Sequence, residues 1–225
     1  MSKKVFLSPS NQYNNVYAYG NTTEGVQCGK IADACKIALE RSGVDVMLMH
    51  DESMQTKCVE SNKFGADLHV PIHTNAFNGK VMGTRMFCYN SGKGMTACKA
   101  IFARVAPLSP GTSENIQVNP KLYEVRVPKA PTAYLECEFH DTVEGAKWVV
   151  ENAATIGEAI ARGICDYFGV TYKPVEQPKP ARPEQPAEQK LYRVQVGAFA
   201  SRANAEKMVQ RLKEAGFDAF IRQDA

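Results

Sequence analysis

The stretch Asp67-Leu-His-Val-Pro-Ile-His-Thr-Asn-Ala-Phe77 has the pattern of a buried β-strand that ends in polar residues. Side chains alternate along a strand, so His69 and His73, four residues apart, are expected on the same face. Asn75 follows at the end of the strand, where an open α/β sheet usually forms its ligand crevice. From the strand alone, the two histidines are equally well explained as functional groups or as hydrogen-bonded structural residues.

Strand and helix patterns alternate along the chain on both sides of this stretch. Short apolar runs predict strands at residues 5–7, 44–50, 83–89 and 133–139. Apolar residues at helical spacing predict helices at residues 24–41, 53–64, 94–106 and 149–167. This alternation predicts an α/β fold, with an open twisted mixed sheet and helices on both faces.

Residues 173–190 mark the clearest boundary in the chain. They contain five prolines among Glu, Gln, Lys and Ala residues, a composition that cannot build a core and favours an extended tether. The sequence therefore predicts a large domain at residues 1–172, a linker at residues 173–190 and a short segment at residues 191–225.

The short segment has a strand–helix–strand pattern. A strand is predicted at residues 191–199, then a helix that Ser201 can cap, then a second strand at residues 217–221. This pattern resembles half of a SPOR domain, a peptidoglycan-binding fold of the ferredoxin-like type. Because about 35 residues cannot bury a core alone, we expect two chains to pair their halves in a homodimer. The alternative is a tail that becomes ordered only on a partner or a glycan.

The composition is that of an ordinary globular protein, with 44% hydrophobic and 23% charged residues. A formal net charge of +3, without a basic run that contains aromatic residues, argues against a nucleic-acid partner. No apolar run approaches the ~18 residues of a membrane span, and the N-terminus has no signal-peptide pattern. The seven cysteines lack metal-finger spacing and are predicted to be small core residues formed in a reducing compartment. We therefore expect synthesis in the cytoplasm without insertion into a membrane.

Acidic and imidazole side chains can meet at the ends of these elements. Glu24 opens the first helix, His73 ends a central strand, and Glu136 lies with Glu138 in the apolar strand at 133–139. An ionised carboxylate in an apolar strand is costly unless it meets a cation, a metal or hydrogen-bond donors. Carboxylate and imidazole ligands at strand ends could form an open zinc site, with a nearby carboxylate as general base.

These segments resemble the zinc-dependent N-acetylmuramoyl-L-alanine amidases of the amidase-3 type, which occur in bacterial autolysins and phage endolysins. The resemblance covers residues 4–170, and residues 66–76 are similar to the family strand that carries a zinc-binding histidine. It implies that His73 and Glu24 bind Zn2+ and that Glu136 is the catalytic glutamate. The implied reaction is hydrolysis of the amide between the N-acetylmuramic acid lactyl group and L-alanine of peptidoglycan.

The sequence departs from the family at one zinc ligand. The family has a histidine after its first strand, whereas this chain has Asn11, followed by Gln12. Either amide could bind metal weakly or through water, although an amide oxygen is a poorer zinc ligand than imidazole. His69 lies about 13 Å from His73 by strand rise and could contribute only if the strand bends. The third outcome is a scaffold that binds metal poorly. We favour a working variant with Asn11 as the third ligand.

The remaining polar candidates are assigned to substrate binding or to support of the ligands. They are Gln12, His69, Asn75, Glu138 and His140. Glu124 and Arg126 are interpreted as part of an ordinary solvated loop. The expected protein is a peptidoglycan hydrolase, either an endolysin or an autolysin, that acts on the cell wall after release. The alternative is a non-catalytic peptidoglycan-binding protein that keeps the amidase scaffold.

Overall fold

The computed structural model describes residues 2–112, 115–175 and 194–222. These residues belong to two compact units, Met1–Val175 and Glu176–Ala225. The first unit contains a six-stranded sheet in the order β2-β1-β3-β6-β4-β5. Its strands are β1 (Lys4–Pro9), β2 (Asp45–Leu48), β3 (Leu68–Asn75), β4 (Arg85–Cys88), β5 (Asn115–Val118) and β6 (Tyr134–Phe139).

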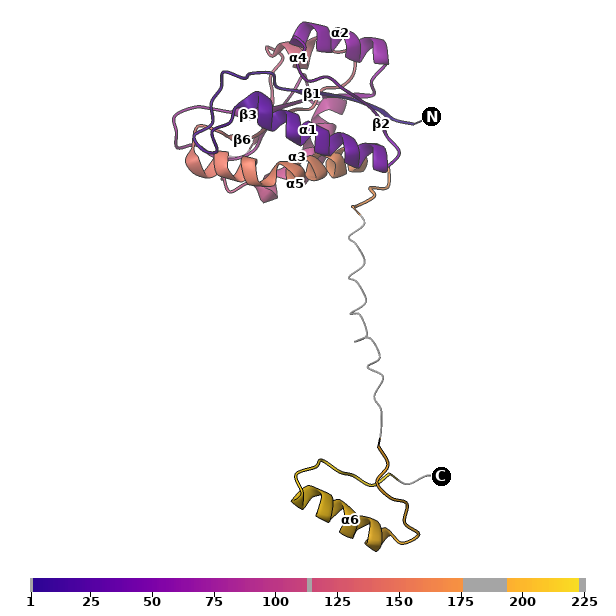
Figure 1. Cartoon of the computed structure of the whole chain (residues 1–225). Helices are drawn as coiled ribbons and strands as arrows, with labels where there is room; N and C mark the ends of the chain where they lie inside the picture. The colour runs from indigo at the N-terminus through magenta and orange to yellow at the C-terminus, as the bar shows by residue number, and fades with distance from the viewer. Residues whose placement is uncertain (1, 113–114, 176–193, 223–225) are drawn as a thin grey trace. The chain divides into compact units, whose positions relative to one another are not determined.

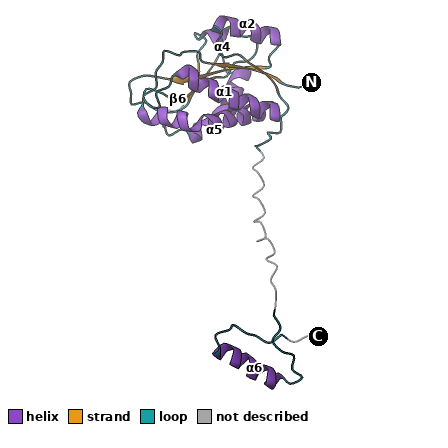
Figure 2. Cartoon of the chain, in the orientation of Figure 1, coloured by secondary structure: helices purple, strands orange, loops and turns teal. Residues whose placement is uncertain are grey.

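The sheet is mixed, as the alternating pattern predicts. Strand β1 pairs in parallel with both β2 and β3, and β3 pairs in parallel with β6. Strand β4 runs antiparallel to β6, and β5 runs parallel to β4 at the edge. Figure 2 shows these strands running through the middle of the unit, between helices.

Helices cover both faces of the sheet. They are α1 (Glu24–Arg41), α2 (Met54–Phe64), α3 (Lys93–Val105), η1 (Ala106–Leu108), α4 (Tyr123–Arg126) and α5 (Val143–Phe168). Helices α1, α3 and α5 lie on one face, whereas α2 and α4 lie on the other (Figure 1). The predicted α/β fold with helices on both faces is thereby confirmed. Strand β5 and helix α4 are not predicted from the sequence, because both are four residues long and lie in a proline-rich passage.

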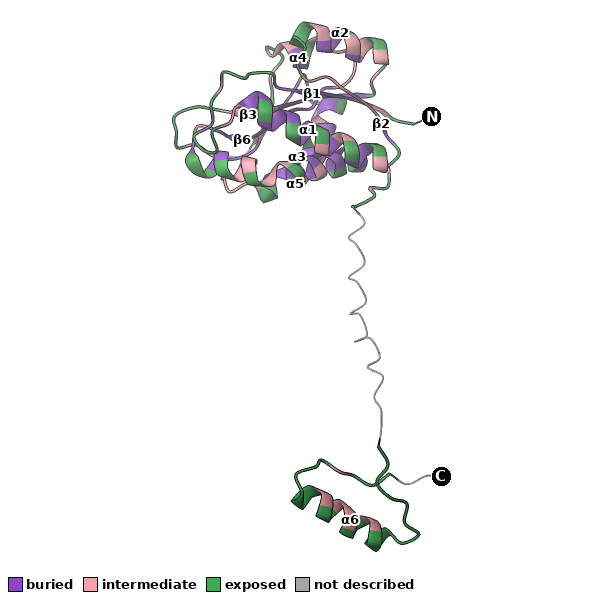
Figure 3. Cartoon of the chain, viewed as in Figure 1, coloured by how far each residue is buried: buried purple, intermediate pink, exposed green. Residues whose placement is uncertain are grey.

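The core lies between the sheet and the α1–α5 layer, where the strand residues are buried (Figure 3). Gly157 of α5 sits against α1, and a Cβ at this position would lie 2.5 Å from the Ile31 carbonyl oxygen. All seven cysteines are buried free thiols, as expected of small core residues. Within the described residues, no helix is both long and apolar enough to cross a bilayer.

The second unit contains α6 (Arg202–Glu214), which confirms the helix predicted after Ser201. The flanking segments at residues 194–199 and 217–221 form no strand, so the predicted strands are absent from these described residues, and residues 191–193 lie outside them. None of the α6 residues is buried (Figure 3). Phe220, beyond this helix, is 78% exposed. A strand requires a hydrogen-bonding neighbour and an apolar face requires a cover, and the described residues of this unit supply neither.

Candidate active site

The polar cluster of the first unit forms where β3 ends and α1 begins. Strand β3 carries His73 near its last residue, and Glu24 is the first residue of α1. Nδ1 of His73 lies 2.9 Å from Oε1 of Glu24. The Glu24 side chain is buried, whereas the His73 side chain is 12% exposed. The structure therefore brings together two of the three residues that the sequence analysis assigns to metal binding.

The loop after β1 supplies the third member of this cluster. Nε2 of Gln12 lies 3.3 Å from Oε1 of Glu24 and 3.5 Å from Nδ1 of His73. Asn15 connects Glu24 and Gln12, because its side-chain amide donates to Oε2 of Glu24 at 2.7 Å and to Oε1 of Gln12 at 3.0 Å. The side chain of Asn11 is exposed and donates to the backbone carbonyl of Glu52 at 3.0 Å. It is therefore Gln12, and not Asn11, that the structure places beside Glu24 and His73.

The charges of Glu24 and His73 stabilise each other. Burial by itself raises the pKa of Glu24, but the hydrogen bond and charge of His73, with the Asn15 amide, bring that pKa below its ordinary value. Burial likewise lowers the pKa of His73, but the Glu24 hydrogen bond and the charges of Glu136, Glu24 and Glu124 raise it above its ordinary value. The cluster therefore favours an ionised carboxylate beside a positive charge, whether that charge is a proton or a metal ion.

Glu136 lies next to His73 across the sheet, since the two residues are in register on β6 and β3. Oε2 of Glu136 is buried and has no hydrogen-bond partner among the described residues. Burial raises the pKa of Glu136 to about 7, with the charge of His73 opposing this shift and the charge of Glu24 adding to it. A carboxylate with a pKa near neutrality can both accept and return a proton, which is what a general base requires.

Beneath this cluster, His69 is buried between two helices of the opposite layer. Its Nδ1 lies 3.0 Å from the Ser61 hydroxyl of α2, and its Nε2 lies 3.2 Å from Oε1 of Glu124 of α4. The Ser8 hydroxyl also donates to Oε1 of Glu124, at 2.5 Å. Glu124 is 7% exposed, so its interpretation as part of a solvated loop is wrong. No local sequence signal indicates this burial, because it arises from the packing of α4 over β3.

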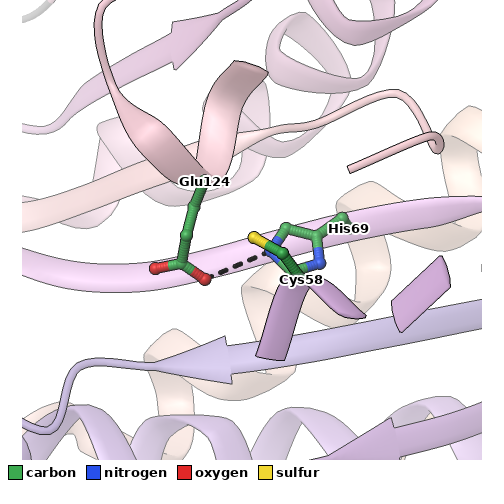
Figure 4. Close-up of side chains that lie close together, drawn as sticks. All are labelled: Cys58, His69 and Glu124. Atoms are coloured by element: carbon green, nitrogen blue, oxygen red, sulfur yellow. Dashed lines mark hydrogen bonds and ion pairs between the residues drawn. The ribbon is translucent and has the colours of Figure 1, made fainter. Parts of the chain in front are cut away.

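Cys58, His69 and Glu124 form a second group of possible metal ligands, shown in Figure 4. One ligand atom from each lies within 4.8 Å of the others, and all three residues are buried. Burial raises the pKa of Cys58 to about 12, which keeps the thiol protonated. Both nitrogens of His69 already have hydrogen-bond partners. His69 and Glu124 are therefore already engaged in hydrogen bonds within the protein.

The other predicted site residues make contacts that hold neighbouring loops. Glu138 is buried and accepts hydrogen bonds from the Gly83 amide and the Ser109 hydroxyl. His140 stacks on Tyr17 at a centroid distance of 5.0 Å, and its Nδ1 lies 3.0 Å from the Thr74 hydroxyl. Oδ1 of Asn75 accepts a hydrogen bond from the Ala76 amide. These hydrogen bonds shape the rim of the cluster but do not connect these residues to Glu24 or His73.

Open α/β sheets bind their ligands outside the carboxyl ends of the strands, and here an imidazole, carboxylates and amides gather at that edge, as in an active site. The family model for N-acetylmuramoyl-L-alanine amidases matches residues 11–166, and the model for the SPOR domain matches residues 177–224. The chain therefore belongs to the N-acetylmuramoyl-L-alanine amidase family. The expected activity, cleavage of the muramoyl–L-alanine amide of peptidoglycan, is confirmed at the level of this family.

Individual relatives agree with this assignment. The sporulation-specific N-acetylmuramoyl-L-alanine amidase of Bacillus subtilis (strain 168) is 23% identical over 226 residues, which covers 97% of this chain and 84% of the relative. The catalytic domain of CwlV, an amidase from Bacillus (Paenibacillus) polymyxa, shares the fold with a TM-score of 0.67 at 17% identity, covering 75% of this chain and 99% of that domain. Cwp6 from Clostridium difficile has a TM-score of 0.69 at 23% identity. That match covers 74% of this chain and 29% of the longer Cwp6 chain.

Proposed function

We propose that the protein is a zinc-dependent peptidoglycan amidase in which Glu24, His73 and Gln12 hold the metal and Glu136 is the general base. One observation carries this proposal. Three side chains from β3, α1 and the loop after β1 converge within 3.5 Å of one another, beside a carboxylate whose pKa is about 7.

The residues present suit Zn2+ as a ligand set. Imidazole nitrogen and carboxylate oxygen are common zinc ligands, and three protein ligands leave a fourth position for water or substrate. The Gln12 amide must present its oxygen to the metal, which requires the amide group to turn over from its present orientation. An amide oxygen binds more weakly than a histidine, so the affinity of this site is expected to fall below that of a site with two histidines.

The metal and the residues around it would have separate roles in the reaction. Bound Zn2+ would polarise the scissile carbonyl and lower the pKa of a water molecule. Glu136 would accept the proton of that water and return it to the leaving amine of L-alanine. Tyr134 stacks on His73 at a centroid distance of 4.8 Å, and the Asn15 amide donates to Oε2 of Glu24. These contacts hold His73 and Glu24 in place before substrate arrives, whereas Gln12 would give up its contact with Asn15 when its amide turns toward the metal.

The proposal is tested by the conservative variant Glu136→Gln, with Glu144→Gln as the matched control. Glu144 is an exposed carboxylate in the first turn of α5, so its variant should keep full activity. Released L-alanine amino termini are counted after incubation with purified peptidoglycan, and binding is measured by pelleting with the walls. We expect Glu136→Gln to lose at least ~100-fold in rate, since general base catalysis contributes about that much, and to keep wall binding. Unchanged release by Glu136→Gln would exclude Glu136 as the base. If the wild-type protein binds walls and releases nothing, the protein is a binding protein.

We also propose that two chains pair their C-terminal segments to complete one SPOR domain. The supporting observation is the exposure of large apolar side chains on both sides of α6. Val194 is 86% exposed, Phe217 is 64% exposed and Phe220 is 78% exposed. Analytical ultracentrifugation at micromolar concentration should show a dimer for the wild-type chain and a monomer for Phe217→Ser combined with Phe220→Ser. A wild-type monomer would contradict the pairing.

A further inference from the structure

Glu124 lies between the two histidines of β3. Its Oε1 accepts a hydrogen bond from the Ser8 hydroxyl at 2.5 Å and lies 3.2 Å from Nε2 of His69. Its Oε2 lies 4.0 Å from Nε2 of His73, within the range of an ion pair. One carboxylate from a four-residue helix therefore faces both histidines, although their backbone positions are four residues apart on the strand.

The two nitrogens of His73 face different partners. Nδ1 faces Glu24 and Gln12, which are the proposed metal ligands, at 2.9 and 3.5 Å. Nε2 faces only Glu124 among the ion pairs of the described residues. If Nδ1 binds the metal, the ring proton must lie on Nε2, where Glu124 is the nearest carboxylate. The 4.0 Å between Nε2 of His73 and Oε2 of Glu124 is longer than a direct hydrogen bond, which would form if the two groups closed by about 1 Å.

The Glu124 side chain is held in place by its neighbours. A residue that orients another side chain must itself be fixed in this way. It is 7% exposed, and Ser8 and His69 fix its Oε1 from two different strands. His69 is fixed in turn by Ser61 of α2 and by stacking on Phe6 at a centroid distance of 5.2 Å. The chain of contacts Ser61–His69–Glu124–His73 thus runs from the interior of the α2 layer to the cluster at the strand ends.

We propose that Glu124 is a positioning residue for the amidase reaction, which accepts the Nε2 proton of His73 and so fixes this ring for metal binding through Nδ1. This inference rests on the proposed zinc site at Glu24, His73 and Gln12. A carboxylate that binds the second nitrogen of a ligating histidine fixes its tautomer and raises its basicity, and its loss typically reduces metal affinity or activity by about 10–100-fold. His69 and Ser61 act one step further away, by holding Glu124.

The test measures zinc affinity, by competition with a chromophoric chelator, for the wild-type chain, Glu124→Gln and the control Glu60→Gln. Glu60 is a carboxylate on α2 that pairs with the exposed Lys63. Glu124→Gln is expected to bind zinc about 10–100-fold more weakly, with a matching loss in kcat and little change in KM. Glu60→Gln should match the wild-type chain. Unfolding of the metal-free variants is measured in parallel. An unchanged zinc affinity for a folded Glu124→Gln variant would overturn the inference.

A measurement on the wild-type chain keeps the inference testable if Glu124→Gln does not fold. In the zinc-loaded protein, 15N spectra of the histidine rings should show His73 protonated at Nε2 and unprotonated at Nδ1. A proton on Nδ1 would overturn the role of Glu124. Failure of the zinc site itself has a different signature, because the wild-type chain and His73→Ala would then bind zinc equally weakly.

Discussion

Glu136, the proposed general base, should destabilise the metal-free protein. Its Oε2 is buried without a hydrogen-bond partner among the described residues, and its pKa is raised from 4.5 to about 7. A folded-state pKa above the unfolded value means that folding becomes less favourable as the carboxylate ionises. The stability present below pH 4.5 is therefore lost as pH rises through about 7.

The size of the effect follows from the same shift. A change from 4.5 to about 7 corresponds to at most about 3.5 kcal/mol. Because the side chain is partly exposed, we expect roughly 1–2 kcal/mol of this value to be realised. Glu136→Gln removes the charge and keeps the shape, so it should be more stable than the wild-type chain by this amount at about pH 8 and by almost nothing at about pH 4.

Urea unfolding of the chelator-treated wild-type chain and of Glu136→Gln at several pH values provides the assay. Glu144→Gln is the control, and its difference from the wild-type chain should stay within about 0.5 kcal/mol. A Glu136→Gln variant that is less stable than the wild-type chain at about pH 8, or a difference that does not grow with pH, would refute the argument from burial.

Three further predictions concern metal binding, catalysis and packing. Direct titration with Zn2+ should show at least tenfold weaker binding for Gln12→Ala and less than about threefold change for Asn11→Ala. The reverse order of the two variants would indicate that Asn11 is the ligand. The kcat/KM should rise with pH, by up to about tenfold per pH unit, because Glu136 must be ionised to act as the general base. The inflection should lie at or below about pH 7, because a bound cation lowers the pKa of Glu136. A kcat/KM that falls with rising pH below this inflection would contradict the role of Glu136 as the base. Gly157→Ala should lower the free energy of unfolding by about 1–3 kcal/mol, because its Cβ would meet the Ile31 carbonyl oxygen at 2.5 Å, and an unchanged urea midpoint would contradict this packing.

The large elements of the fold could be predicted because their signals are local. Helix α1 has the predicted bounds of residues 24–41, and β3 lies within the predicted stretch at residues 67–77. The periodicity of apolar residues is a property of the segments themselves, and so is Gly43, which follows α1 with a φ of 84° that favours glycine. The residues at the ends of these two elements, Glu24 and His73, could be assigned to one cluster because the family resemblance implies that both bind the same metal.

The remaining features depend on contacts between segments far apart in the sequence. Asn11 and Gln12 are neighbours in a loop, and only the folded loop determines which side chain turns toward Glu24. Glu124 becomes buried because its short helix packs beside α2, over the strand that carries His69. The strands predicted at residues 191–199 and 217–221 require a pairing partner, and the described residues of this segment provide none.

The most direct test of the account is mass spectrometry of the products released from purified peptidoglycan by the wild-type chain, with chelator and after addition of Zn2+. The account predicts stem peptides with free L-alanine amino termini that disappear with chelator and return with Zn2+. Release that continues at the same rate after complete removal of metal would contradict a zinc site at Glu24, His73 and Gln12.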